Sequence, residues 1–175
     1  MAKKLALIFA FACLSAASAS AVEPTRERTN VIALSNDFGD RYNFRQLTYE
    51  RAWGRQSCLI GLSGGLLVDG SDENNFGDYS AVGGVAAYRW WLGPRPTLMG
   101  WFVGPALRYG VKSLSGNSNG PAIGTRSTFL SAALEGGYQK IFKNGFTLGV
   151  GTEVNRWEGS SSFGIGLTLG LGYAY

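Results

Sequence analysis

The chain has 175 residues and a formal net charge of +4, with 45% apolar residues, 16% charged residues and no histidine. This length allows one domain of ordinary size, and the high apolar content with little net charge excludes an intrinsically disordered chain. The absence of histidine removes the commonest general base and the commonest metal ligand, which argues against most hydrolases and metalloenzymes.

The first 21 residues have the features of a secretory signal peptide. Lys3 and Lys4 precede an unbroken apolar run over 5–14, and the small residues 19–21 fit the A-x-A cleavage rule. The run is too short to cross a bilayer, because a membrane helix needs about 20 residues. We therefore expect a cleaved signal peptide at 1–21, and export that leaves a short periplasmic leader at 22–29.

The two cysteines bear on the exported chain. Cys13 suggests a lipoprotein as an alternative, although Ala10 stands where a lipobox normally has leucine. Cleavage leaves Cys58 alone, so that no intramolecular disulfide is possible. Loss of the two lysines lowers the basic count from 16 to 14 against 12 acidic residues, a balance too mild to indicate a nucleic-acid partner.

After the signal peptide, hydrophobicity alternates with period two, which is typical of β-strands. The clearest example is 163–175, where odd positions are large and apolar and even positions are small. A bulky face opposite a nearly bare one suits a narrow barrel with a lipid-facing exterior and a crowded interior, 30–175. We expect eight strands, at 30–36, 43–53, 57–68, 80–92, 98–113, 127–142, 146–157 and 162–175.

The expected connections alternate in length. Tight turns at 54–56, 93–97 and 143–145 separate longer polar loops at 37–42, 69–79 and 114–126, with a shorter last loop at 158–161. Short turns on one rim and longer loops on the other are typical of outer-membrane barrels, whose turns are periplasmic. An even number of strands also returns the end of the chain to the rim where it starts.

Aromatic residues gather near both rims, as interface-anchored barrels require. We expect one belt at the turns and the C-terminus, comprising Trp53, Trp90, Trp101, Phe142, Phe146, Tyr173 and Tyr175. We expect a second belt at the long loops, comprising Tyr42, Phe44, Tyr79, Tyr109, Phe129, Trp157 and Phe163.

The end of the chain resembles the C-terminal assembly signal of bacterial outer-membrane proteins, in which alternate apolar residues lead to a terminal aromatic. The residues that carry this resemblance are Leu167, Leu169, Leu171, Tyr173 and Tyr175. Such a signal implies periplasmic chaperones and the barrel-assembly machinery as partners during biogenesis. A terminal tyrosine departs from the usual phenylalanine.

Three internal motifs resemble small OmpA/OmpX-type barrels, and most of all a bacterial outer-membrane family of unknown function within that superfamily. They are Tyr49-Glu50-Arg51, Tyr88-Arg89-Trp90-Trp91 and the segment 100–105. The resemblance spans nearly all of 43–175 and implies an eight-stranded antiparallel up-and-down transmembrane β-barrel without an open pore. We also expect a monomer in the outer membrane, in contact with lipid and lipopolysaccharide.

Five charged residues fall on the small-residue faces of the expected strands: Glu50, Arg89, Arg108, Glu135 and Glu153. Counted from the turns, Glu50 and Arg89 lie at one depth, and the other three lie about two layers higher. Because an unpaired buried charge costs several kcal/mol or more, we expect two ionic layers that plug the interior. The alternative is that some of these residues are ordinary hydrated interior residues.

Two motifs suggest chemistry that the rest of the sequence does not support. The segment 61–65 matches G-x-S-x-G, but it lies within a strand and the chain has no histidine to serve as a base. The acidic segment 69–78 has Asn74 where a calcium loop requires glycine, and it lacks the bidentate glutamate. We therefore expect no enzyme activity, no cofactor and no metal site.

The leading hypothesis for function is an integral outer-membrane barrel with a structural or surface-interaction role. A narrow channel or small-ligand transport barrel is the first alternative, because glycine-rich walls leave space inside. A soluble lipocalin-like carrier is the second, because it shares the strand number.

Overall fold

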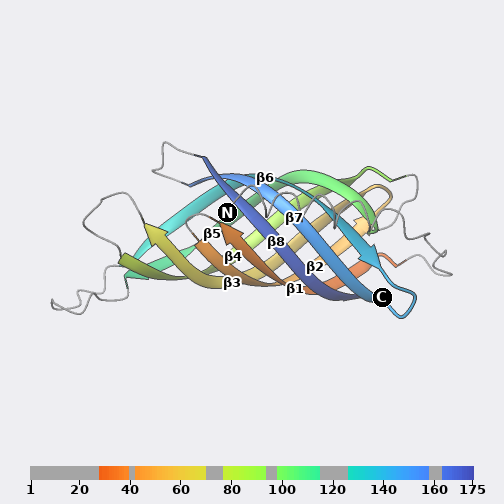
Figure 1. Cartoon of the computed structure of the whole chain (residues 1–175), viewed down its shortest axis with the longest axis horizontal. Coiled ribbons are helices and arrows are strands. Elements are labelled where there is room, and N and C mark those ends of the chain that lie inside the picture. The colour runs from red at the N-terminus through yellow and green to blue at the C-terminus, as the bar shows by residue number, and fades with distance from the viewer. Residues whose placement is uncertain (1–27, 40–41, 70–76, 94–97, 115–125, 158–162) are drawn as a thin grey trace, which may run out of the picture.

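The protein is a closed β-barrel of eight antiparallel strands in chain order, with β8 paired to β1 (Figure 1). The computed structural model describes residues 28–39, 42–69, 77–93, 98–114, 126–157 and 163–175. The strands are β1 (Asn30–Gly39), β2 (Tyr42–Trp53), β3 (Gln56–Asp69), β4 (Gly77–Trp91), β5 (Gly100–Leu114), β6 (Arg126–Ile141), β7 (Phe146–Trp157) and β8 (Phe163–Ala174). The predicted all-β, eight-stranded up-and-down fold is confirmed. The described residues contain no helix that could span a membrane.

The first strand is longer than predicted. It ends at Gly39 rather than at residue 36, so the expected loop at 37–42 is wrong and only 40–41 separate β1 from β2. Asp37 is buried and Phe38 is exposed, which continues the in–out alternation that begins at Val31. A polar residue that faces inward thus resembled a loop residue in the sequence. The predicted signal peptide at 1–21 and most of the leader at 22–29 lie outside the described residues.

Side chains alternate between a buried inner face and an exposed, mostly apolar outer face on every strand. Along β2 the alternation is nearly complete. Large apolar residues point outward from different sides of the barrel, with Leu62 of β3 71% exposed and Ile165 of β8 68% exposed. A water-soluble protein would bury such residues, so the exterior suits an apolar surrounding.

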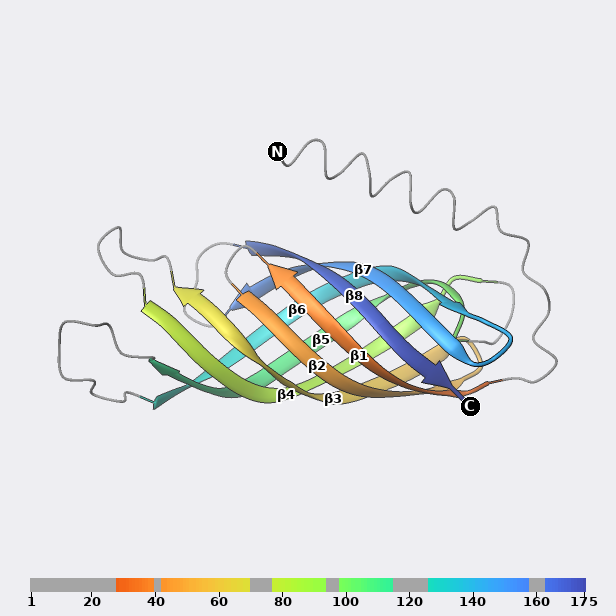
Figure 2. The same cartoon turned by 60° about the horizontal axis from the view of Figure 1, so that its bottom comes forward.

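The wall of the barrel is higher on one side. Strands β3 to β6 have 14, 15, 15 and 16 residues, whereas the other four have 10 to 12. Figure 2 shows the ends of β3 to β6 extending beyond those of β1, β2, β7 and β8 at the rim opposite the C-terminus. We call the rim of the 54–55 and 142–145 turns the turn end and the opposite rim the loop end.

The two predicted aromatic belts have different outcomes. All seven residues of the turn-end belt are exposed on the outer surface. The loop-end belt is wrong for Tyr42, Phe44 and Phe129, which are buried inside the barrel, and for Trp157, which packs against them. These four occupy inward positions of their strands, and proximity to a loop does not determine which way a side chain points. Tyr109 and Phe163 do face outward, and the side chain of Tyr79 lies outside what the structure describes.

Candidate functional site in the barrel interior

An apolar layer closes the interior at the turn end. Its buried members are Val31, Ala52, Trp91, Leu98, Phe102 and Ala174. Leu98 is fully buried and precedes β5, which begins at Gly100 rather than at the predicted residue 98. The Leu98 carbonyl accepts a hydrogen bond of 2.7 Å from Gln139 Nε2, which ties this segment to β6.

The turn-side cluster is Arg89 with the carboxylates of Glu50 and Glu135. Arg89 Nη1 lies 2.9 Å from Glu50 Oε2, and Arg89 Nε lies 2.5 Å from Glu135 Oε1. Glu50 also accepts a hydrogen bond of 2.6 Å from Ser57 Oγ. The guanidinium of Arg89 lies 4.3 Å from the ring centroid of Phe102, so a cation–π contact joins the cluster to the apolar layer.

This arrangement corrects the predicted depth of Glu135, which was expected beside Arg108. Glu135 pairs across the sheet with Gly104 of β5, whose backbone lies against Arg89 of β4. A Cβ on Gly104 would lie 1.7 Å from the Tyr88 carbonyl oxygen, so no side chain can stand between Arg89 and Glu135. Counting from the turns missed this contact because the strands of a barrel are tilted, and residues across the sheet differ in depth.

The loop-side cluster is Arg108 with the carboxylates of Asp37 and Glu153. Arg108 Nη2 lies 2.7 Å from both Asp37 Oδ2 and Glu153 Oε2, and its Nη1 donates to Glu153 Oε1 at 3.1 Å. Gln46 donates to Asp37 and Tyr42 donates to Glu153. The pairing of Arg108 with Glu153 agrees with the predicted layer, and Asp37 is a member that the sequence analysis missed.

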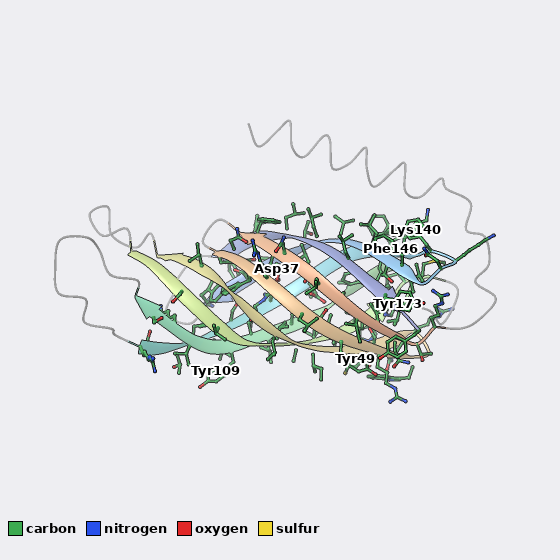
Figure 3. The ribbon with its side chains drawn as sticks, turned by 90° about the horizontal axis from the view of Figure 1, so that it is seen from below. Asp37, Tyr49, Tyr109, Lys140, Phe146 and Tyr173 are labelled. Carbon is green, nitrogen blue, oxygen red and sulfur yellow. The ribbon has the colours of Figure 1, made fainter. Side chains whose placement is uncertain are left out.

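Of the cluster residues that the sequence does not predict, Asp37 could have been found from its position in β1. Asp37 continues the series of odd, inward positions of β1 that begins at Val31, and its wall position follows once β1 is extended to Gly39. Figure 3 shows Asp37 over the body of the barrel, whereas Tyr109 points away from it. Asn155, also missed, donates to Tyr42 Oη at 2.7 Å and to Glu153 Oε1 at 3.0 Å.

An aromatic cap lies between the loop-side cluster and the loop end of the barrel. It consists of Tyr42, Phe44, Phe129 and Trp157. Ring centroids are 5.4 Å apart for Tyr42 and Trp157, 5.5 Å for Phe129 and Trp157, and 6.1 Å for Phe44 and Phe129. Tyr42 belongs to the cap and also donates to Glu153, so the cap and the loop-side cluster are one connected unit.

A cavity of about 60 Å³ lies in the interior between the two clusters. Carboxylates of both clusters line it, and small residues of β1, β7 and β8, among them Ser35, Gly149 and Gly170, form one of its walls. From the turn end, the described interior is therefore an apolar layer, an ionic cluster, a small cavity, a second ionic cluster and an aromatic cap.

The residues of the expected assembly signal lie in and after β8. Leu169, Leu171, Tyr173 and Tyr175 are exposed on the outer face, and Leu167 is half-buried there. Main-chain hydrogen bonds of 3.0 and 3.3 Å join Tyr175 to Asn30, which completes the closure of β8 on β1.

Comparison with known proteins relates the chain to others by fold. No protein-family model and no curated protein sequence matches it. Among solved structures, the attachment invasion locus protein Ail of Yersinia pestis matches with a TM-score of 0.51 and 15% identity over 86% of this chain and all of Ail. The N-terminal barrel domain of Pseudomonas aeruginosa OprF matches with a TM-score of 0.52 and 14% identity over 85% of this chain and 98% of that domain. The predicted resemblance to small OmpA/OmpX-type barrels is thus confirmed for the fold: the chain has the architecture of the small barrels of outer-membrane proteins.

Proposed function

We propose that the protein is an integral barrel of the bacterial outer membrane, with a closed interior and a surface-interaction role. The outer surface carries this proposal. Large apolar residues are exposed on all sides of the barrel, among them Leu34, Leu62, Leu130, Leu148 and Ile165. A soluble lipocalin-like carrier would direct such residues inward, toward its ligand.

The filled interior supports a structural rather than a conducting role. Two salt-bridged clusters, the apolar layer and the aromatic cap occupy successive depths of the barrel. An eight-stranded barrel has an interior only just wide enough to be filled by its own side chains. The proposal is therefore that the polar and ionic side chains plug the lumen and that the protein has no enzymatic activity.

The high wall supports a role at the cell surface. At the loop end of β4 to β6 outward positions are polar, as at Ser80, Ser113 and Thr128. We expect this part of the sheet to stand above the apolar band and to carry the loops 70–76 and 115–125 outward. A barrel of the same fold is named an attachment invasion protein, so the fold is compatible with surface contact.

The proposed partners follow from the two ends of the outer surface. In the loop half, the outward basic residues Arg45, Arg126 and Arg156 suit contact with lipopolysaccharide phosphates. At the other end, the exposed apolar residues of β8 suit recognition by the barrel-assembly machinery, with delivery by periplasmic chaperones. We propose a monomer that binds no nucleic acid.

Cell fractionation combined with a heat-modifiability gel tests location and barrel together. We expect the protein in the outer-membrane fraction, resistant to carbonate extraction, with a faster-migrating band before boiling than after. Recovery in the soluble periplasmic fraction would favour the carrier alternative and overturn the proposal.

Planar-bilayer recording tests the closed interior. We expect no stable single-channel steps from the purified barrel. The narrow-channel alternative requires such steps, and requires them to vanish when Gly149→Leu and Gly151→Leu fill the thin wall beside the cavity.

A loop exchange tests the surface role. Replacing 70–76 and 115–125 with Gly-Ser segments of equal length should leave the heat-modifiable barrel intact and abolish binding of the displaying cells to a panel of matrix and envelope proteins. Equal binding by cells that display the wild-type barrel and cells that display the exchanged barrel would contradict a role for the high wall.

A further inference from the structure

The two ionic clusters carry more negative than positive charge. Each contains one guanidinium and two carboxylates, which leaves one excess negative charge per cluster. Lys112 also occupies an inward position, four residues nearer the loop end than Arg108, and it does not line the cavity. Even with Lys112 counted, one negative charge remains uncompensated among the inward side chains that the structure describes.

The hydrogen bonds around the clusters suit ionised carboxylates. Ser57 Oγ accepts from Trp91 Nε1 at 2.9 Å and so directs its own proton to Glu50. Tyr42 Oη accepts from Asn155 and likewise directs its proton to a carboxylate of the loop-side cluster. A protonated carboxyl group would need an acceptor in place of these donors. Glu50 and Glu153 are therefore ionised in this arrangement, and a proton on neither of them removes the excess charge.

The cavity lies where that charge is concentrated. Asp37, Glu50 and Glu135 line its volume of about 60 Å³, which is room for a few water-sized groups. Arg89 and Arg108 also line it, so carboxylates outnumber guanidinium groups by one. Asp37 is 1% exposed, and its Oδ1 atom has no hydrogen-bond partner. The hydroxyl-bearing residues Ser35 and Thr168 line the same space.

We infer that this cavity is a binding site for one monovalent cation, held with part of its hydration water against Asp37. Asp37 and Glu153 share the one guanidinium of Arg108, and a small cation with oxygen ligands offsets the cost of the excess buried charge. Among the described residues, no three His, Cys, Asp or Glu side chains are grouped as ligands of one metal ion, so the cavity does not offer the carboxylate-rich ligand set that a divalent ion requires. The site requires only the closed interior, not any particular location or loop partner of the protein.

Anomalous scattering locates the cation directly. Crystals of the detergent-solubilised full barrel grown in Tl⁺ or Rb⁺ salts should show one anomalous peak in the cavity, within coordination distance of the Asp37 carboxylate. A cavity without a peak would overturn the proposal. The proposal would also be overturned by an infrared band of a protonated carboxyl group that disappears in Asp37→Asn or Glu135→Gln.

Thermal unfolding provides an independent readout. At constant ionic strength, the temperature of the heat-modifiability transition should rise with the logarithm of Na⁺ or K⁺ concentration as choline is replaced, because a ligand that binds only the folded state stabilises it. Asp37→Asn should lose this dependence on Na⁺ or K⁺. If Asp37→Asn fails to assemble, Glu135→Gln, which removes a cavity-lining carboxylate of the other cluster, is the replacement variant and should lose the dependence too. Asp72→Asn removes a carboxylate of the 70–76 segment and should keep the dependence. Identical wild-type transitions in NaCl and choline chloride would refute the site.

Discussion

Arg89 connects two carboxylates that would otherwise be buried without a counter-charge. Its replacement by alanine leaves Glu50 and Glu135 facing each other across the interior. Removing one partner of a buried ion pair typically costs about 3–5 kcal/mol. We expect Arg89→Ala to lower the urea midpoint of the folded barrel and to weaken its heat-modifiable band.

A neutral version of the same cluster is the matched control. The triple variant Glu50→Gln, Arg89→Met and Glu135→Gln removes all three charges at similar volume, and it should recover most of the lost stability, because well-packed neutral replacements of buried ion pairs are often tolerated. If Arg89→Ala unfolds at the wild-type urea concentration, the turn-side cluster does not stabilise the barrel.

Period two was enough to predict which charged residues face inward, but not which of them meet. Glu50, Arg89, Arg108, Glu135 and Glu153 all lie on inner faces, as predicted. Their pairing depends on the register between strands and on one missing side chain, at Gly104, which lets Arg89 reach across β5. Neither register nor such a gap is visible in single-strand periodicity. Asp37 falls within the segment 37–42, for which the sequence predicts a loop, although it lies in β1.

At Gly104, the backbones of β4 and β5 lie too close together to leave room for a side chain. Because a Cβ there would lie 1.7 Å from the Tyr88 carbonyl oxygen, Gly104→Ala must push the two strands apart. Overpacking of this kind typically costs about 1–3 kcal/mol. We expect a lower urea midpoint and slower folding into lipid vesicles. The folding rate is measured from the appearance of the fast-migrating band on the gel.

Gly84→Ala supplies the control within the neighbouring strand. Gly84 faces outward on β4, and an added Cβ would lie 3.6 Å from its nearest neighbour, which is an ordinary contact. This variant should fold like the wild type. Equal behaviour of the two alanine variants would show that strand separation at Gly104 does not limit the barrel.

At the scale of elements, alternation predicted all eight strands but not the contents of the loop end. Proximity to the loops predicts a lipid-facing position for the four residues of the aromatic cap, and all four lie inside. The same alternation that placed Glu50 inside also places Phe44 inside, since both are even positions of β2. Parity along each strand therefore outweighs distance from the rim when an aromatic side chain is assigned to a face.

The whole barrel is asymmetric along its axis, and the asymmetry predicts its orientation. The turn end has a complete outward aromatic belt, whereas at the loop end four of the expected aromatics are inside and the high wall of β3 to β6 projects. Short turns in outer-membrane barrels face the periplasm. The high wall should therefore lie outside the cell.

Cysteine labelling of intact cells tests this orientation. In a Cys58→Ser background, Ser113→Cys places a thiol on the high wall and Arg55→Cys places one in the turn between β2 and β3. A maleimide too large to cross the outer membrane should label Ser113→Cys in intact cells, and should label Arg55→Cys only after the membrane is permeabilised. The reverse pattern would mean that the barrel is inserted with its high wall in the periplasm, and the surface-interaction role would then be excluded, because the loops that carry it would never meet the outside.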